Sequence, residues 1–148
     1  LESLIGQYCA GGTEWTYPGE TVDDAFFKDM IQQYCALFFN TGTAGCYEAF
    51  RSLSGTMLSH YKDDTTFMDN MGSYLLVAKD DCKGALKWYN KVLKIKPDDY
   101  TAIRNGLVTA RKMRNVKLQK KFLNLLVEYG NETDRRSAEA QLKALESK

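Results

Sequence analysis

Four residues in the run DCKGALKWYNKVLKIKPDD constrain the fold of this chain most: Ala85, Tyr89, Val92 and Pro97. Counted from Ala85, the other three follow at +4, +7 and +12. Residues three or four apart are neighbours on a helical surface, so the first three share one face of a helix. Proline cannot donate the next backbone hydrogen bond and clashes with the preceding turn, so Pro97 ends that helix. The pattern predicts a helix over 82–96 that packs against its neighbours through this face.

Apolar residues recur at helical spacing along most of the chain. Thr21, Asn115 and Thr133 are typical N-cap residues at the start of such segments. The first twenty residues are loop-rich, with a short helix at 1–9 as one interpretation. The fold is therefore expected to be all-α with about six or seven helices, the last of them a capping helix with a thin apolar stripe. The spacing places these helices at 22–39, 44–61, 65–79, 82–96, 99–113, 116–129 and 134–146.

Three Asp-Asp pairs recur at nearly equal intervals, at 63–64, 80–81 and 98–99. Each pair stands where a predicted helix must begin, and an aspartate there can accept a hydrogen bond from a free backbone N–H. The intervals are too long for one calcium-binding loop. We therefore interpret the pairs as helix caps that recur once in every half of a two-helix unit.

Residues 66–99 resemble a tetratricopeptide repeat, a helix–turn–helix unit of about 34 residues. Gly72 and Ser73 supply the small residues where the first helix crosses the second. Residues 100–133 form a degenerate second unit, in which Gly106 stands one repeat length after Gly72 and Leu123 takes the place of Tyr89. The resemblance implies a right-handed stack of antiparallel helix pairs, and we expect one domain over 1–148. Its expected parts are a loop-rich segment 1–20, an αα-hairpin 21–61, the repeats 66–133 and the capping helix 134–146.

In this family the first helices of the repeats line a concave groove that binds a protein or peptide. The resemblance therefore implies a non-catalytic scaffold, with polar groups at Asn70 and Arg104 that suit a peptide backbone or carboxylate. Core packing is the open alternative for Phe67 and Tyr74. Carried over by position, the groove residues are Phe67, Asn70, Tyr74, Val77, Thr101, Arg104, Val108 and Arg111.

The charge is unevenly distributed along the chain. Residues 1–70 hold three basic against ten acidic residues, and residues 71–148 hold seventeen against nine, so the net charges are −7 and +8. Opposite signs allow head-to-tail self-assembly of copies, the alternative function, although they can equally be two solvated surfaces. The run 111–121 holds six Lys or Arg. No aromatic residue interleaves it for base stacking, so it indicates a solvated turn or an acidic protein partner more than nucleic acid.

The chemistry-bearing residues are few. His60 is the single histidine, and no cysteine spacing is typical of a metal site, so we expect no enzyme activity, metal or cofactor. Cys35 and Cys46 stand five residues before Asn40 and five after Thr41, on the two arms of the predicted hairpin. They are either a disulfide or two free thiols in a helix interface.

The compartment stays open at this stage. No apolar run approaches the roughly 20 residues of a membrane span. Leu1 is not an initiator methionine, so we interpret the chain as a processed product or a fragment. The resemblance is closest to bacterial tetratricopeptide proteins that serve assembly at an envelope. It therefore leans toward an envelope or periplasmic location with a removed signal, with the cytoplasm as the alternative.

Overall fold

A computed structural model describes residues 1–12 and 14–147 of the 148-residue chain. These residues form eight α-helices, and the fold is all-α. The chain divides into two compact units, which we call unit 1 (Leu1–Met71) and unit 2 (Gly72–Lys148). Helix α4 (Thr65–Ala78) begins in unit 1 and ends in unit 2. None of the helices in the described residues combines the length and the apolar character that a membrane span requires.

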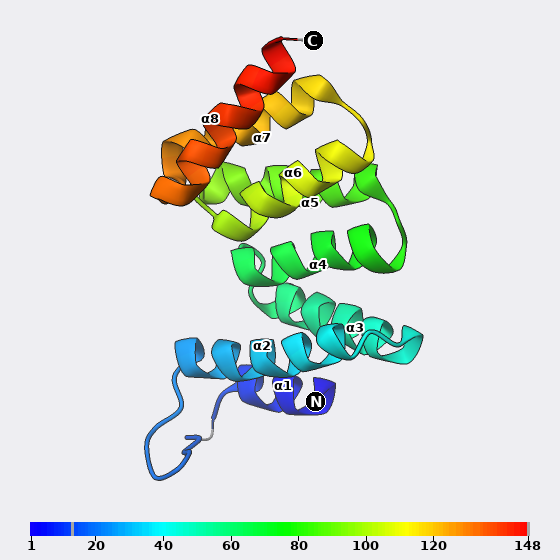
Figure 1. Cartoon of the computed structure of the whole chain (residues 1–148). Helices are drawn as coiled ribbons and strands as arrows, with labels where there is room; N and C mark the ends of the chain where they lie inside the picture. Colours follow the sequence, from blue (N-terminus) through cyan, green and yellow to red (C-terminus); the bar gives the residue numbers. More distant parts are fainter. Residues whose placement is uncertain (13, 148) are drawn as a thin grey trace. The chain divides into compact units, whose positions relative to one another are not determined.

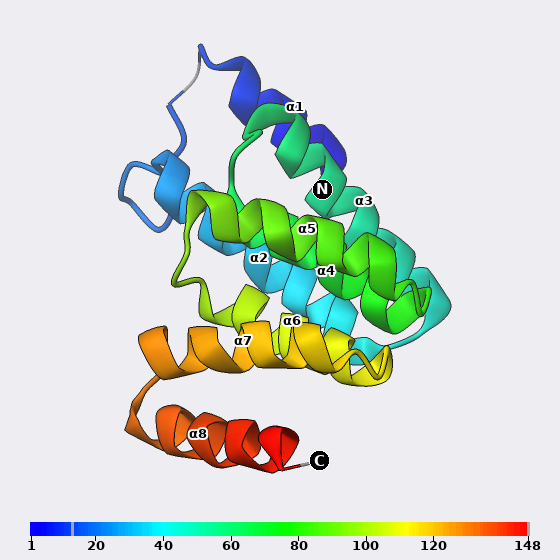
Figure 2. The ribbon, with the colours of Figure 1, turned by 90° about the horizontal axis from the view of Figure 1, so that it is seen from above.

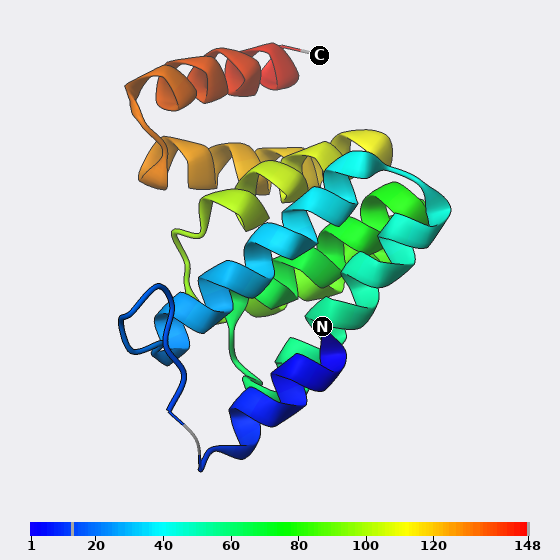
Figure 3. The same cartoon turned by 90° about the horizontal axis from the view of Figure 1, so that it is seen from below.

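Unit 1 is built on the hairpin of α2 (Asp24–Thr41) and α3 (Ala44–His60). Gly42 joins the two helices in the left-handed conformation (φ 77°), which glycine adopts without strain. Helix α1 (Glu2–Ala10) packs against α3 and buries Ile5, so the described part of the chain has more helices than the six or seven expected (Figure 3). The fully buried side chains of α2 are Phe27, Ile31 and Cys35.

Unit 2 continues from the end of α4 through four further helices. Each of these helices contacts the next one along the chain. A short turn between them reverses the direction of the chain (Figure 1). Figure 2 shows this for the last two, which run side by side in opposite directions. These helices are α5 (Cys82–Ile95), α6 (Tyr100–Lys112), α7 (Val116–Tyr129) and α8 (Glu132–Glu146).

The second aspartate of each Asp-Asp pair caps a helix, as the sequence predicts. Asp81 and Asp99 accept hydrogen bonds from the backbone N–H groups of Gly84 (2.9 Å) and Ala102 (3.0 Å). Asp64 Oδ1 accepts one from the N–H of Thr66 at 3.0 Å in the first turn of α4. These bonds satisfy donors that a helix start leaves without a partner, so each pair fixes where a helix begins.

Of the other three N-caps that the sequence predicts, Thr21 and Thr133 were wrong and Asn115 is confirmed. Asp23, not Thr21, caps α2, because Thr21 is instead held in a bridge with Thr16. Asn131, not Thr133, caps α8, which begins at Glu132. Asn115 caps α7 as predicted, accepting from the N–H of Leu118 at 3.0 Å.

Gly72 is a point of close approach between α4 and α5. A Cβ atom at Gly72 would lie 2.7 Å from Tyr89 Cε1, closer than two carbon atoms can pack. The Tyr89 side chain is fully buried, and its hydroxyl lies 3.2 Å from the hydroxyl of Ser73. Asn105 of α6 donates a hydrogen bond to the same Ser73 hydroxyl at 3.3 Å. Gly72 thus leaves room on α4 for the Tyr89 ring of α5, and the Ser73 hydroxyl gives the buried Tyr89 hydroxyl a hydrogen-bond partner.

Gly106 repeats this arrangement one unit later. A Cβ atom there would lie 2.5 Å from Phe122 Cζ, so α6 and α7 pack through a glycine and an aromatic ring. The ring belongs to Phe122, and not to Leu123, the residue that stands one repeat length after Tyr89. The 34-residue spacing that matched Leu123 to Tyr89 is therefore wrong by one residue on α7, where Phe122 takes the place of Tyr89.

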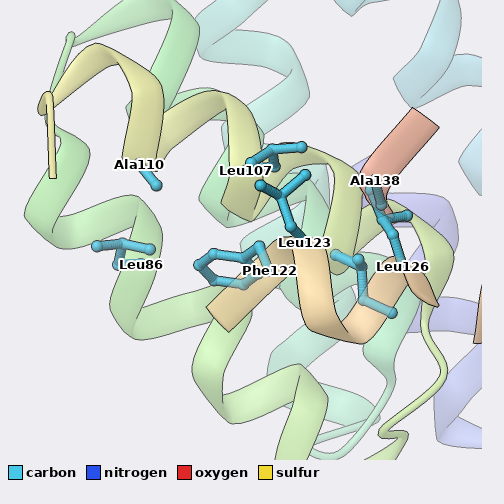
Figure 4. Close-up of a cluster of buried hydrophobic side chains, with 8 residues drawn as sticks. Leu86, Leu107, Ala110, Phe122, Leu123, Leu126 and Ala138 are labelled. Carbon is cyan, nitrogen blue, oxygen red and sulfur yellow. The ribbon is translucent and has the colours of Figure 1, made fainter. Parts of the chain in front are cut away.

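Phe122 also lies at the centre of the unit 2 core. Figure 4 shows its ring in the space bordered by Leu86 of α5, Ala110 of α6 and Leu123 of α7. Ala138 of α8 is fully buried and closes this core from the C-terminal side. One thin apolar stripe on α8 is thus enough for its capping role.

All four cysteines lie in the described residues, and all four are free thiols. Cys35 Sγ lies 3.8 Å from the Ser54 hydroxyl, and burial raises the pKa of the Cys35 thiol to about 11. The Cys35–Cys46 bridge that the sequence left open is therefore not present in this structure. A buried thiol with a raised pKa is also a weak nucleophile.

Candidate binding surfaces

Three of the expected groove residues on α4 are buried. Phe67 has no exposed surface, and Tyr74 and Asn70 retain 2% and 6% of theirs. The Asn70 amide donates to Gln32 Oε1 at 2.6 Å and to the Ser54 hydroxyl at 3.1 Å. These three side chains therefore expose too little surface to bind a partner. The Asn70 amide, moreover, already donates its hydrogen bonds to Gln32 and Ser54 inside the protein.

The four expected groove residues on α6 are exposed and follow one another along one face of the helix. Arg104 Nη1 lies 3.5 Å from Asp134 Oδ1 of α8, and Arg111 donates to Gln141 of the same helix. The arginines are thus oriented by α8 and keep part of their surface in solvent. The α6 face consists of Thr101, Arg104, Val108 and Arg111.

A second surface, with several exposed apolar side chains, lies on α2 in unit 1. Phe26, Tyr34 and Leu37 expose 40%, 43% and 62% of their surface, well above the fraction expected of large apolar side chains in a core. They border a hollow of 650 Å³, within the range of sites that hold small ligands or side chains. We call this surface the α2 apolar face; its apolar and aromatic residues are Tyr17, Phe26, Met30, Tyr34 and Leu37.

The sequence contained a signal for this face that the helical pattern concealed. Phe26, Met30 and Tyr34 recur at i, i+4, a spacing that also fits the core side of an amphipathic helix. The structure buries the adjacent series, Phe27, Ile31 and Cys35, and leaves Phe26 and Tyr34 exposed. Two interleaved apolar series on one helix indicate more apolar surface than one core contact can cover.

The electrostatic setting of the α2 apolar face is negative. Asp29 and Gln33 are the polar residues that line the hollow, and Asp29 is exposed. Unit 1 as a whole carries three basic and ten acidic residues, a net charge of −7. An apolar segment with basic side chains therefore matches this surface better than an acidic one.

The fold is that of a tetratricopeptide-like stack. α2 and α3 in unit 1, and α5 to α8 in unit 2, pack as consecutive antiparallel neighbours. Gly72 and Gly106, one repeat length apart, each receive an aromatic ring from the following helix. No protein-family model and no curated protein matches the chain by sequence. Its fold is nevertheless similar to that of tetratricopeptide-repeat chaperones of type III secretion.

Two solved structures carry this similarity. One is PcrH in complex with the chaperone binding region of PopD, with a TM-score of 0.63, 14% identity, and coverage of 81% of this chain and 93% of that chain. The other is the translocator chaperone SycD of Yersinia enterocolitica, with a TM-score of 0.62, 16% identity, and coverage of 80% and 85%. At this level of identity, the likeness concerns the fold.

Proposed function

We propose that this protein is a non-catalytic scaffold that binds a peptide segment of a partner protein. The observation that carries the proposal is the α2 apolar face, where Phe26, Tyr34 and Leu37 stay exposed around a 650 Å³ hollow. An exposed apolar patch on a folded protein commonly marks an interaction site. The fold similarity supports the proposal, because PcrH was solved with the chaperone binding region of PopD.

The chemistry of the surface indicates what the peptide carries. Aromatic and aliphatic side chains at the hollow favour large apolar anchors, which usually supply most of the binding energy. The net charge of −7 on unit 1 favours Lys or Arg beside those anchors. In unit 2, Arg104 and Arg111 on α6 offer a separate surface that suits a carboxylate.

Random peptides displayed on phage can test the proposal. We expect the selected peptides to combine apolar residues with Lys or Arg. Leu37→Asp should weaken their binding by at least about tenfold, or ~1.4 kcal/mol, because it places a charge in the apolar hollow. The measurement is the Kd of a synthetic selected peptide by calorimetry.

Ile95→Asp is the matched control for this substitution. Ile95 on α5 is 48% exposed, so its replacement adds the same charge at an exposed apolar position outside the α2 apolar face. We expect its Kd to equal that of the unchanged protein. A selection that enriches no peptide, or an equal loss in both variants, would contradict the proposed function.

We also propose head-to-tail self-association as a second candidate function. One observation favours it: the boundary between the compact units, Met71/Gly72, coincides with the point where the charge changes from −7 to +8. Each unit therefore presents one sign of charge to another copy. A head-to-tail contact of this kind need not close into a ring.

Sedimentation velocity at several salt concentrations tests self-association. Screening lengths fall from about 30 Å at 0.01 M to about 8 Å at 0.15 M salt, so we expect the apparent mass to fall as salt rises. A monomer at every salt concentration would exclude this second candidate and leave peptide binding unaffected.

A further inference from the structure

A second cavity in unit 1 shares no lining residue with the α2 apolar face. It has a volume of 440 Å³ and is lined by residues of α1, the loop 14–22, the start of α2 and the end of α3. Three aromatic rings line it, from Tyr8, Trp15 and Tyr61, together with the carboxylates of Glu14 and Asp24. No Lys or Arg is found among the described residues that line it.

The aromatic rings form a corner. The Trp15 and Tyr8 ring centres are 5.8 Å apart with the planes at 78°, and Tyr8 is stacked on Phe27 at 3.9 Å. The Tyr8 ring is thus held in place by a fully buried side chain. The Tyr8 and Trp15 rings therefore meet edge to face at the wall of the cavity. The electron-rich face of an aromatic ring attracts an ammonium group.

Asp24 holds two of these rings and adds negative charge. Its Oδ1 accepts hydrogen bonds from the hydroxyls of Tyr8 at 3.0 Å and Tyr61 at 3.3 Å. Burial and this hydrogen bond raise the pKa of Tyr8 to about 12, and burial also raises the pKa of Tyr61, so both phenols stay neutral donors. Within the described part of the chain, neither Asp24 nor Glu14 forms an ion pair with Lys or Arg.

The same cluster already holds one ammonium group of the chain itself. Lys28 Nζ lies 4.3 Å from the centre of the Tyr61 ring and 3.4 Å from Asp64 Oδ2. Lys28 is therefore neutralised by Asp64 and does not line the cavity. Its position shows that a Tyr61 ring face accepts an ammonium group in this fold.

We propose that this cavity binds an organic ammonium ion, which packs against the aromatic lining of Tyr8, Trp15 and Tyr61 and is attracted by the carboxylates of Asp24 and Glu14. The N-terminal end of α2 lies at this cavity and would by itself attract an anion. The carboxylates of Asp24 and Glu14 repel an anion, however, so an anionic ligand is disfavoured. A bare metal ion is also disfavoured, because the described residues contain no group of three His, Cys, Asp or Glu side chains placed to hold one. The ammonium group can belong to a small molecule or to a lysine side chain, which share this chemistry.

Choline and its neutral isostere, 3,3-dimethylbutan-1-ol, are the probes. In the Trp88→Phe variant, Trp15 is the remaining tryptophan and reports binding by fluorescence. We expect choline to shift the Trp15 emission, with the isostere at least about tenfold weaker because it has the shape without the charge. N-acetyl-lysine methylamide is the second probe and represents a lysine side chain. If it binds more tightly than choline, the site is assigned to lysine side chains; if it binds more weakly, the site is assigned to a small quaternary ammonium ion.

Asp24→Asn and Glu20→Gln form a matched pair of charge removals. Asp24→Asn keeps an oxygen acceptor for the two tyrosines, and Glu20 is an exposed acid of the same loop that does not line the cavity. We expect Asp24→Asn to weaken choline binding by about tenfold and Glu20→Gln to leave it unchanged. Should Asp24→Asn unfold, Glu14→Gln takes its place. Equal binding of choline and the isostere, no shift of Trp15 emission, or equal effects of the two charge removals would overturn the proposal.

Discussion

Replacing Phe122 with alanine is expected to lower the free energy of unfolding of unit 2 by about 3–5 kcal/mol. The Phe122 ring is fully buried and lies among Leu86, Ala110 and Leu123, which come from three different helices. Its removal takes a large apolar surface out of the core and leaves a cavity that three helices cannot close together. The loss is a large share of the total stability of a domain of this size.

The measurement can be confined to unit 2. In a Trp15→Phe background, Trp88 of α5 is the remaining tryptophan, so its fluorescence in a denaturant titration follows unit 2. Tyr129→Ala, at an aromatic residue 41% exposed on α7, is the control within unit 2 and should change stability by less than about 1 kcal/mol. A Phe122→Ala loss as small as that of the control would show that the core is not organised around this ring.

Replacing Gly106 with alanine is expected to destabilise unit 2 by about 1–3 kcal/mol. The change adds one methyl group, which would lie 2.5 Å from Phe122 Cζ, so the ring or one of the helices must move. Alanine is otherwise the better helix former by about 1 kcal/mol, and the clash must exceed that gain. A loss of stability in Gly106→Ala would therefore show that close packing against Phe122 dominates, and a gain would show that helix propensity dominates.

Gly55 provides the matched comparison for Gly106. It lies inside α3, and a Cβ atom there would meet nothing within 4 Å. Gly55→Ala should therefore stabilise the protein by up to about 1 kcal/mol. In a Phe122→Leu background the loss from Gly106→Ala should shrink, because leucine lacks the ring atoms that clash. Equal effects at Gly55 and Gly106 would mean that α6 and α7 do not pack through this glycine.

Much of the secondary structure could be predicted from the sequence, because helix starts and stops depend on residues a few positions apart. Asp64, Asp81 and Asp99 cap helices as predicted, since an N-cap hydrogen bond reaches only two or three residues along the chain. The end of α5 before Pro97 follows from the missing donor of proline. Gly72 and Gly106, one repeat length apart, likewise indicate two helix crossings from the sequence alone.

The binding surfaces could be predicted less well, because exposure depends on which neighbours cover a helix. Asn70 was expected in a groove, yet its amide is bound to Gln32 and Ser54, which lie 38 and 16 residues away. On α2, apolar periodicity could not say which of two adjacent series faces the core. Phe27 is buried because α2 packs against α3 and the Tyr8 ring of α1 stacks on Phe27, whereas Phe26 stays exposed.

The sequence by itself determined most of the helices, the caps at Asp64, Asp81, Asp99 and Asn115, and the small residues at two helix crossings. These features follow from local hydrogen bonding and the helical turn. Only the tertiary structure decided that Phe122 and not Leu123 meets Gly106, because a one-residue shift along a helix turns a side chain by about 100°. It also brought Tyr8, Asp24 and Tyr61 into one cluster from three separate parts of the sequence. Contacts between such distant residues depend on how whole helices pack, which no local pattern records.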